Sequence, residues 1–187
     1  MGARMRAEPT RLDGVLVIHA NPRSDERGMF TRLFCTDTLA PWLGERRVVQ
    51  INQSRTHRPG AVRGMHFQYG AHAEMKLVRC IRGRVWDVAL DLRAGSPTFL
   101  HWHAQELSAD NQQMLLIPEG FAHGFQVLEA DSELLYLHTA AYHAAAEGGV
   151  RPDDPRVAID WPLPLADLSE RDRNHPLLGP DFHGLQP

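Results

Sequence analysis

Two short apolar runs are joined by a Pro-x-Gly segment in the stretch Met114-Leu-Leu-Ile-Pro-Glu-Gly-Phe-Ala-His-Gly-Phe-Gln-Val-Leu128. The runs, Met114–Ile117 and Gly124–Leu128, have the length and composition of strands. Pro118 and Gly120 are turn residues, and His123 directly precedes the second run. The stretch therefore predicts a strand, a turn and a second strand, with a histidine where the second strand begins.

Runs of the same kind recur on both sides of this stretch. They are rich in Val, Leu, Ile and aromatic residues and are separated by Gly, Pro, Asp and Ser. We expect further strands at Val15–His19, Phe30–Phe34, Val48–Asn52, Lys76–Ile81, Val85–Leu92, Phe99–Glu106 and Glu133–Thr139. Regular short strands separated by turns favour an all-β sandwich or barrel over alternating βαβ units.

Two short helices are expected besides the strands. Asp37–Leu43 is predicted as the first, with Asp37 or Thr38 as its N-cap and Pro41 near its first turn, where a missing N–H does least harm. Ser169 and Asp172 have the spacing of a capping box, which predicts a short C-terminal helix.

Alternation along Val85–Leu92 predicts a wall with two different faces. Trp86, Val88, Leu90 and Leu92 share one side of the strand, whereas Asp87, Ala89 and Asp91 share the other. Likewise Leu134, Tyr136 and His138 share one face of Glu133–Thr139. Large apolar groups on one side and small or acidic groups on the other fit the wall of a barrel with a polar interior.

Composition excludes several classes of protein. The formal charge of −3 gives no basic excess, so we expect no nucleic-acid partner. The chain has neither a signal-type apolar segment nor an 18-residue apolar run, so we expect neither secretion nor membrane insertion. Cys35 and Cys80 are then expected to be free thiols of a cytoplasmic protein.

The length of 187 residues fits one domain. Residues 1–13 are polar and lack periodicity, so we predict a flexible N-terminal arm there. Residues 14–187 contain no internal repeat or linker and are predicted to form a single domain.

The pattern P-x-G-x-x-H of residues 118–123 is similar to the second signature of cupin barrels, and Arg63-Gly-Met-His66-Phe-Gln68 is similar to the first. The resemblance implies a jelly-roll barrel. Metal-binding cupins carry a second histidine where this chain has Gln68, and imidazole supplies most of the affinity for such metals. We therefore expect no metal and no other cofactor, although His72, Glu74 and His123 could form an accidental site.

An ordered set of motifs extends this likeness over residues 14–178. It comprises Arg63-Gly-Met-His66-Phe-Gln, Lys76-Leu-Val-Arg-Cys, Gly83-Arg-Val-Trp-Asp-Val, Asp91-Leu-Arg with Ser96-Pro-Thr-Phe, Ile117-Pro-Glu-Gly-Phe-Ala-His-Gly-Phe and Leu168-Ser-Glu-Arg-Asp172. The set resembles the dTDP-4-dehydrorhamnose 3,5-epimerase family. This resemblance implies a dimeric, metal-independent cupin that epimerises 4-keto-6-deoxy sugars attached to a nucleoside diphosphate, here expected to be dTDP.

The resemblance also implies roles for individual residues. His66 matches the catalytic base, Asp172 its acidic partner, Tyr136 the acid on the opposite face of the sugar, and Lys76 the lysine beside the enolate oxygen. Positions that line the nucleotide-sugar cleft are matched by Arg27, Gln50, Asn52, Arg63, His123 and Tyr142.

Elementary chemistry explains these residue types. A hydrogen on a carbon beside a ketone is removed by a base with a pKa near neutrality, which is the range of histidine. The enolate then needs a positive or hydrogen-bonding group at its oxygen, a role that suits Lys76. Inversion requires a proton from the other face, for which Tyr136 is the candidate. Arg27 and Arg63 offer the fork-shaped donors that a diphosphate prefers.

One position departs from the family. Arg32 stands where many relatives carry a glutamate that contacts the nucleotide base. Arginine has only donors, so it cannot accept a hydrogen bond from the thymine N–H. The base, or the way in which it is held, is left open by the sequence.

Each of these residues also has an ordinary structural interpretation. His66 could be a core histidine, Tyr136 a packed aromatic, Lys76 an edge lysine, and Asp172 only the N3 residue of the capping box. Asp87, Asp91 and Arg93 are assigned to structure. The same holds for the surface or wall residues His101, His103, His138 and His143, and composition alone accounts for His19, His57, His72, His175 and His183.

Three functions remain open at this point. The first is inversion of carbons 3 and 5 of a keto-sugar nucleotide, and the second is inversion of one carbon only. The third is a cupin without turnover, or a metal-dependent cupin enzyme.

Overall fold

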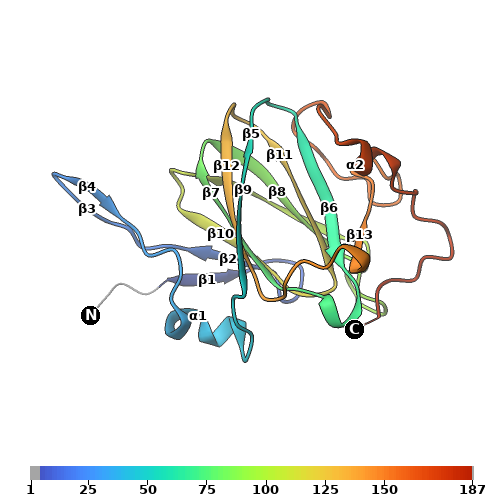
Figure 1. Ribbon diagram of the computed structural model, residues 1–187, viewed down its shortest axis with the longest axis horizontal. Coiled ribbons are helices and arrows are strands. Elements are labelled where there is room, and N and C mark those ends of the chain that lie inside the picture. The colour runs from blue at the N-terminus through green and yellow to red at the C-terminus, as the bar shows by residue number, and fades with distance from the viewer. Residues whose placement is uncertain (1–4, 187) are drawn as a thin grey trace.

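The computed structural model describes residues 5–186 as two packed β-sheets (Figure 1). The first sheet has the order β1-β2-β10-β7-β12-β5 and the second the order β13-β6-β11-β8-β9, and the pairings within both are antiparallel. The predicted all-β, cupin-type jelly roll with a few short helices is confirmed.

The first sheet contains β1 (Arg6–Pro9), β2 (Leu16–His19), β5 (Gln50–Thr56), β7 (Lys76–Arg82), β10 (Gln113–Ile117) and β12 (Ser132–His138). The second contains β6 (Val62–Gln68), β8 (Arg84–Asp91), β9 (Trp102–Ser108), β11 (Phe121–Val127) and β13 (Glu147–Gly149). Outside them lie the hairpin of β3 (Arg23–Asp25) and β4 (Gly28–Phe30), the helices α1 (Thr36–Leu43) and α2 (Glu170–Asn174), and the 3-10 turns η1 (Gly70–His72) and η2 (Ala144–Ala146).

The stretch around Pro118 carries the chain from one sheet to the other. β10 belongs to the first sheet and β11 to the second, so the Pro-x-Gly turn crosses between the layers. Side chains of both sheets then meet in a shared core, where Val78 and Leu115 from the first sheet pack with Ala89 and Phe125 from the second. This core fills part of the sandwich and leaves the rest of the interior to polar groups.

The predicted two faces of β8 are confirmed. Ala89 lies in the core between the sheets, whereas Val88, Leu90 and Leu92 lie in a separate apolar cluster with Trp86 packed against it. The C-terminal segment covers this second cluster, with partners that include Val157, Leu185, Trp161 and Phe182. The outer face of the second sheet is therefore buried by chain that also carries α2.

The predicted loose arm is wrong for residues 5–13; residues 1–4 lie outside the described part of the chain. β1 pairs with β2, and Leu12, at 1% exposure, is part of the core between the sheets. The sequence did not predict this strand, because an edge strand buries few side chains and so lacks an alternating apolar pattern. The extension of a single domain over residues 14–187 stays a prediction.

Two further expectations are corrected. The expected strand at Phe30–Phe34 ends at Phe30, because this segment belongs to the β3–β4 hairpin, which projects from the body (Figure 1). The first helix begins at Thr36 with Cys35 as its N-cap and no side-chain cap, and Pro41 lies inside it rather than in its first turn. Burial of Leu39 and Leu43 holds this helix against the first sheet.

Truncation of Leu12 tests the packed N-terminal segment. We expect Leu12→Ala to lower the free energy of unfolding by about 2–5 kcal/mol, since it opens a cavity in the core. Urea denaturation measures this change. Glu8→Ala on the neighbouring exposed strand is the control and should change stability by less than about 0.5 kcal/mol. Equal stability of the two variants would contradict the packing described here.

Candidate active site

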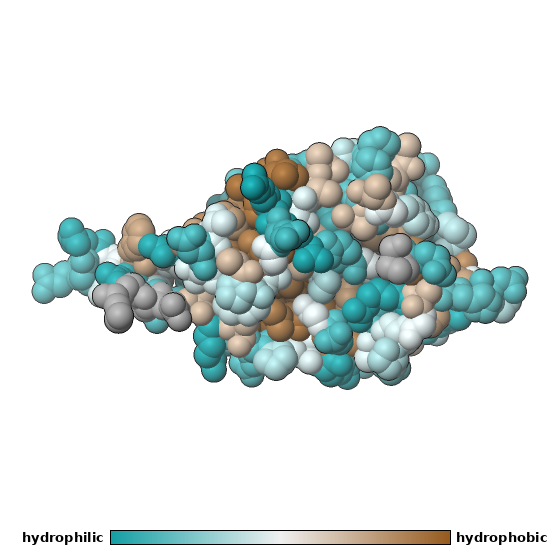
Figure 2. Space-filling view, turned by 90° about the horizontal axis from the view of Figure 1, so that it is seen from below, coloured by the Kyte–Doolittle hydropathy of each residue, from teal (hydrophilic) through white to brown (hydrophobic). Residues whose placement is uncertain are grey.

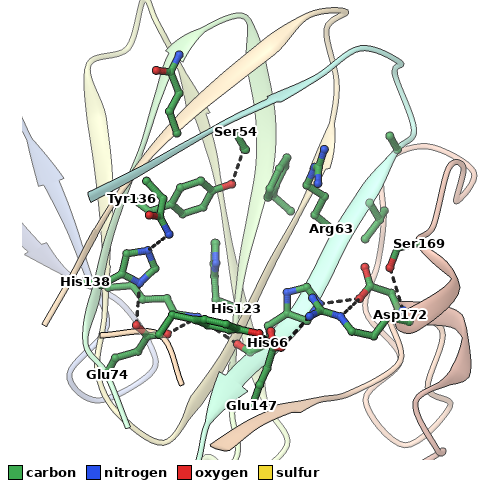
Figure 3. Close-up of a pocket in the computed structure, with 18 of the residues that line it drawn as sticks. Ser54, Arg63, His66, Glu74, His123, Tyr136, His138, Glu147, Ser169 and Asp172 are labelled. Carbon is green, nitrogen blue, oxygen red and sulfur yellow. Dashed lines mark hydrogen bonds and ion pairs between the residues drawn. The ribbon is translucent and has the colours of Figure 1, made fainter. Parts of the chain in front are cut away.

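A polar cleft of about 960 Å³ lies between the two sheets at the open part of the sandwich (Figure 3). All four predicted catalytic residues line it, and so do four of the predicted substrate-binding residues. These eight residues are His66, Lys76, Tyr136, Asp172, Asn52, Arg63, His123 and Tyr142.

His66 and Asp172 form a pair on the wall made by the second sheet. His66 Nε2 lies 2.6 Å from Asp172 Oδ1, although the two residues are 106 positions apart. The second carboxylate oxygen accepts a weaker contact from the backbone N–H of Gly64, at 3.4 Å. With its Nε2 proton held by Asp172, a neutral His66 ring carries its lone pair on Nδ1, which is therefore the basic nitrogen.

Asp172 takes part both in the N-terminal cap of α2, through its backbone N–H, and in the pair with His66, through its carboxylate. Ser169 is the N-cap of α2, and its hydroxyl accepts the backbone N–H of Asp172 at 3.0 Å, which leaves the carboxylate for His66. Burial by itself would raise the pKa of Asp172. The hydrogen bond from His66, its charge and the contact with Ser169 hold that pKa below its ordinary value, so Asp172 is a carboxylate at neutral pH.

Close backbone packing sets the position of His66. Gly64, at φ +128°, faces the neighbouring strand β11, where a Cβ would come within 2.5 Å of the Cα of Gly124. No residue with a side chain fits this approach. The two strands therefore meet backbone to backbone, and His66 pairs across them with His123.

Tyr136 faces the cleft from the other sheet. Its hydroxyl lies 2.8 Å from Ser54 Oγ, and its ring contacts the edge of His123, whose Nε2 is 2.9 Å from the buried Asp87. Burial raises the pKa of Tyr136 well above its ordinary value, so the phenol keeps its proton at neutral pH. His66 and Tyr136 thus share one cavity and approach it from opposite walls (Figure 3).

Lys76 belongs to a buried network rather than to a solvated edge. Its ammonium lies 3.2 Å from Glu74 Oε1 and donates to the carbonyl of His66 at 3.3 Å. The other carboxylate oxygen, Glu74 Oε2, lies 2.7 Å from His138 Nδ1. Burial would raise the pKa of Glu74, but His138 and Lys76 hold it below its ordinary value, so the carboxylate stays charged and keeps Lys76 at the cleft.

Arg171 is a cleft residue that the sequence interpretation missed. Its guanidinium lies 3.0 Å from His66 Nε2 and 2.7 Å from Glu147 Oε2. A ring nitrogen that donates to Asp172 has no lone pair for a guanidinium N–H, so Asp172 and Arg171 compete for Nε2. Arg171 directly precedes Asp172 in the motif Leu168-Ser-Glu-Arg-Asp172, and this position was the signal that could have placed it at the cleft.

Three predicted binding residues do not line the cleft. Gln50 lies at its rim, where it accepts the backbone N–H of Tyr142 at 2.9 Å. Arg27 is on the β3–β4 hairpin with an 89% exposed side chain that pairs with Asp25, and Arg32 follows the same hairpin. Their roles stay predictions.

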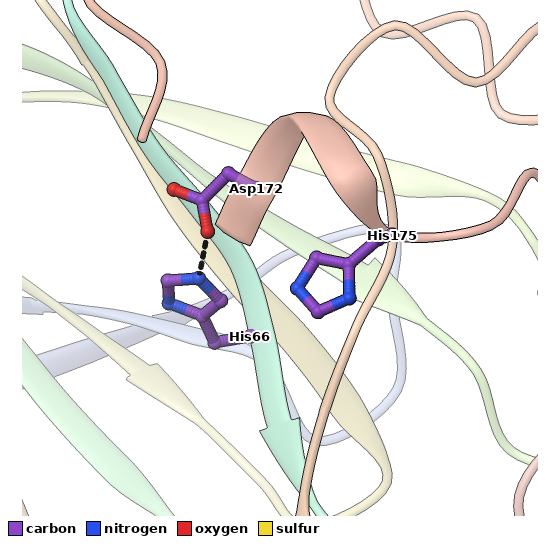
Figure 4. Close-up of side chains that lie close together, drawn as sticks. All are labelled: His66, Asp172 and His175. Atoms are coloured by element: carbon purple, nitrogen blue, oxygen red, sulfur yellow. Dashed lines mark hydrogen bonds and ion pairs between the residues drawn. The ribbon is translucent and has the colours of Figure 1, made fainter. Parts of the chain in front are cut away.

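The structure does not bring together the three residues that could have formed an accidental metal site. Among the described residues, the cluster with ligand atoms close enough for a metal is His66, Asp172 and His175, rather than His72, Glu74 and His123 (Figure 4).

Two further residues line the cleft. These are His138, which was assigned to structure from the sequence, and Glu74. Cys35 and Cys80 are free thiols.

Known proteins resemble this chain over most of its length. The sequence model of a family described as dTDP-4-dehydrorhamnose 3,5-epimerase matches residues 9–179. A dTDP-4-dehydrorhamnose 3,5-epimerase of Sinorhizobium fredii is 42% identical over 88% of this chain and 85% of its own. A dTDP-4-dehydrorhamnose 3-epimerase of Streptomyces niveus is 39% identical over 93% of this chain and 84% of its own.

A solved structure shows the same likeness in three dimensions. The 3,5-epimerase of Legionella pneumophila, in complex with dTDP-4-keto-L-rhamnose, superposes with a TM-score of 0.86. It is 40% identical to this chain and the match covers 91% of this chain and 90% of that one.

The pair at Asp172 gives a pH-dependent prediction. A carboxylate whose folded pKa is depressed adds stability above its ordinary pKa of 3.8, and this stability is lost as the pH falls through the folded pKa. We expect Asp172→Asn to cost about 1–3 kcal/mol at pH 7 and less as the pH falls below about 4. Urea denaturation at several pH values measures this difference. Asp153→Asn, which breaks a surface pair with Arg151, is the control; a gap independent of pH would contradict the assignment.

Proposed function

The chain belongs to the dTDP-4-dehydrorhamnose 3,5-epimerase family, and we propose that it inverts carbons 3 and 5 of a dTDP-linked 4-keto-6-deoxy sugar. The observation that carries the proposal is the placement of His66 and Tyr136 on opposite walls of one cleft. An epimerase must remove a proton from one face of a carbon and return one to the other face.

The first step is removal of a proton beside the ketone. His66 Nδ1 takes the proton, and Asp172 stabilises the imidazolium that forms. This division of labour is familiar from His–Asp pairs in which the carboxylate fixes the ring and stays ionised. The 2.6 Å contact, with Asp172 buried to 3% exposure of its side chain, supports that role.

The second step is stabilisation of the enolate. Negative charge moves from the broken C–H bond to the ketone oxygen, and Lys76 is the cation placed to receive it. Glu74 fixes Lys76, and His138 in turn fixes Glu74. These two residues act as positioning residues in this proposal, because they reach the substrate oxygen through Lys76.

The third step is protonation from the other face. The Tyr136 hydroxyl gives its proton to the enolate carbon, the ketone re-forms, and the phenolate is neutralised by a proton from solvent. The phenol carries its proton at neutral pH, as this step requires, while burial raises its pKa and so makes it a weaker acid than an exposed tyrosine. His66 releases the proton it accepted to solvent, and repetition at the second carbon beside the ketone then completes the double inversion, with side chains of the protein as the acid and the base.

The nucleotide is proposed to bind across two subunits. Arg63 and Arg171 offer guanidinium groups inside the cleft, whereas Arg27 and Arg32 lie near the exposed hairpin of the same chain. We infer a homodimer in which this hairpin brings both arginines to the partner's cleft. The hairpin carries Phe30 at 72% exposure, and Ile51 on the edge strand β5 is 60% exposed, so each chain offers apolar surface for such pairing.

A cytoplasmic location is also proposed. No helix among the described residues is long and apolar enough to cross a membrane. Both cysteines are free, which fits a reducing compartment.

Inversion of one carbon only is the second candidate. It is favoured by the Streptomyces niveus relative, which is named a 3-epimerase and is about as similar to this chain as the 3,5-epimerases are. Both candidates use the same base and acid, so the residues of the cleft do not separate them.

Solvent exchange tests the mechanism and counts the carbons. In deuterated water the wild-type protein should introduce deuterium at carbons 3 and 5 of a dTDP-4-keto-6-deoxy sugar, as read by mass spectrometry and NMR. His66→Ala should lower exchange at least about 100-fold, as expected for loss of a general base. Tyr136→Phe should keep exchange and lose inversion. Exchange at one carbon supports the second candidate, and equal exchange in wild type and the His66 variant refutes the assignment.

Disruption of the hairpin surface tests the dimer. We expect Phe30→Asp to shift the protein from dimer to monomer in light scattering and to raise the KM for the nucleotide sugar. Glu26→Gln on the same hairpin is the matched control and should leave both unchanged. A Phe30 variant that remains dimeric with wild-type KM would contradict the proposed pairing.

A further inference from the structure

His175 lies next to the catalytic pair without a role in the chemistry above. It follows α2 directly, three positions after Asp172, and this spacing places both side chains on the same side of the short helix. The rings of His66 and His175 meet edge to face with centroids 6.3 Å apart (Figure 4). His175 Nε2 is buried and has no hydrogen-bond partner among the described residues.

We propose that His66, Asp172 and His175 form an inhibitory site for Zn²⁺. One ligand atom from each residue lies within 4.8 Å of those from the other two, which is close enough for a shared ion after small side-chain adjustments. Two imidazoles and one carboxylate are a common zinc ligand set, and the fourth position would face the cleft. Zn²⁺ prefers imidazole to the water and carboxylate oxygens that suit Mg²⁺ and Ca²⁺.

The backbone around the cluster makes room for His175. Gly149 on β13 pairs with His66, and a Cβ on Gly149 would lie 2.2 Å from His175 Nε2. Any larger residue there would push the ring out of its position. The site therefore depends on a glycine that is not itself a ligand, which provides an independent way to disrupt it.

Two features decide how the ion would enter. His66 Nε2 and Asp172 Oδ1 lie 2.6 Å apart, so the proton between them has to move to Nδ1 of the ring before both atoms can bind the ion. Arg171, 3.0 Å from His66 Nε2, has to leave, and it can do so because its side chain is 51% exposed and keeps Glu147 as a partner. Binding thus shifts the ring proton of His66 to Nδ1 and displaces the guanidinium of Arg171 from Nε2.

Inhibition follows from the ligand roles. A neutral imidazole that binds the ion through Nε2 carries its proton on Nδ1, so Nδ1 has no lone pair left to accept a proton from the substrate. The ion also occupies the carboxylate that stabilises the imidazolium. This part rests on the proposed epimerase activity, whereas binding of the ion does not.

Calorimetric titration with zinc chloride tests binding, and deuterium exchange into the keto-sugar nucleotide tests inhibition. We expect wild type to bind one Zn²⁺ per chain and to lose exchange, with recovery after EDTA. His175→Gln and Gly149→Ala should keep basal exchange without zinc and bind Zn²⁺ at least about tenfold more weakly, a loss of the size seen when support of a metal site is removed. Both should keep exchanging at zinc concentrations that inhibit wild type.

His143→Gln is the matched control. His143 stacks on His72 with ring centroids 4.0 Å apart, which is the other close histidine pair that could attract zinc. Loss of zinc binding in this variant, unchanged binding in His175→Gln, or no binding by wild type would overturn the proposal. If the wild-type protein binds zinc but shows no deuterium exchange even in the absence of zinc, the result would support the zinc site and refute the epimerase function instead.

Discussion

The contact between His66 Nε2 and Asp172 joins a strand inside a β-sheet to a short helix in the C-terminal segment. His66 lies on β6 inside the second sheet, and Asp172 lies on a five-residue helix that is too short to be stable by itself. Tertiary packing has to supply what the helix lacks. The C-terminal segment buries Val157, Trp161 and Leu185 against the outer face of β8, and this packing brings α2 beside β6. The geometry of the His66–Asp172 pair therefore depends on apolar burial on the far side of the sheet from the cleft.

Separation of Tyr136 from His66 follows from the sandwich itself. The cleft occupies the part of the interior that the shared core leaves unfilled, and each sheet contributes one wall. β6 provides His66 and β12 provides Tyr136, so the two groups cannot approach each other without compression of the layers. Seen from below in the space-filling view, the surface is mostly hydrophilic, and apolar residues lie in scattered groups over the body of the molecule (Figure 2). The side chains of both His66 and Tyr136 are partly buried at the cleft, and His66 keeps 24% of its side chain exposed.

The all-β fold and the grouping of His66, Asp172 and Tyr136 around one cleft could be predicted from the sequence, because short periodic strands and an ordered motif set are local signals. Glu74 and His138 were not assigned to the site, since the register of β12 against β7, which sets His138 opposite Lys76, is a long-range property. β1 was missed for a similar reason, as only its pairing with β2 reveals it as a strand. The roles of Arg27 and Arg32 stay predictions, because the β3–β4 hairpin that contains Arg27 and precedes Arg32 projects away from the body that holds the cleft (Figure 1).

The facing glycines Gly64 and Gly124 have a consequence for how such enzymes can diverge. A Cβ on Gly124 would meet the Arg63 carbonyl oxygen at 2.8 Å, just as one on Gly64 would meet β11, so neither position can accept a larger amino acid independently. The contact between β6 and β11, beside the cleft residues His66 and His123, is thus closed to substitution at both glycines. New sugar preferences have to arise from the rim and the opposite wall, and mutant libraries aimed at altered selectivity should be concentrated there.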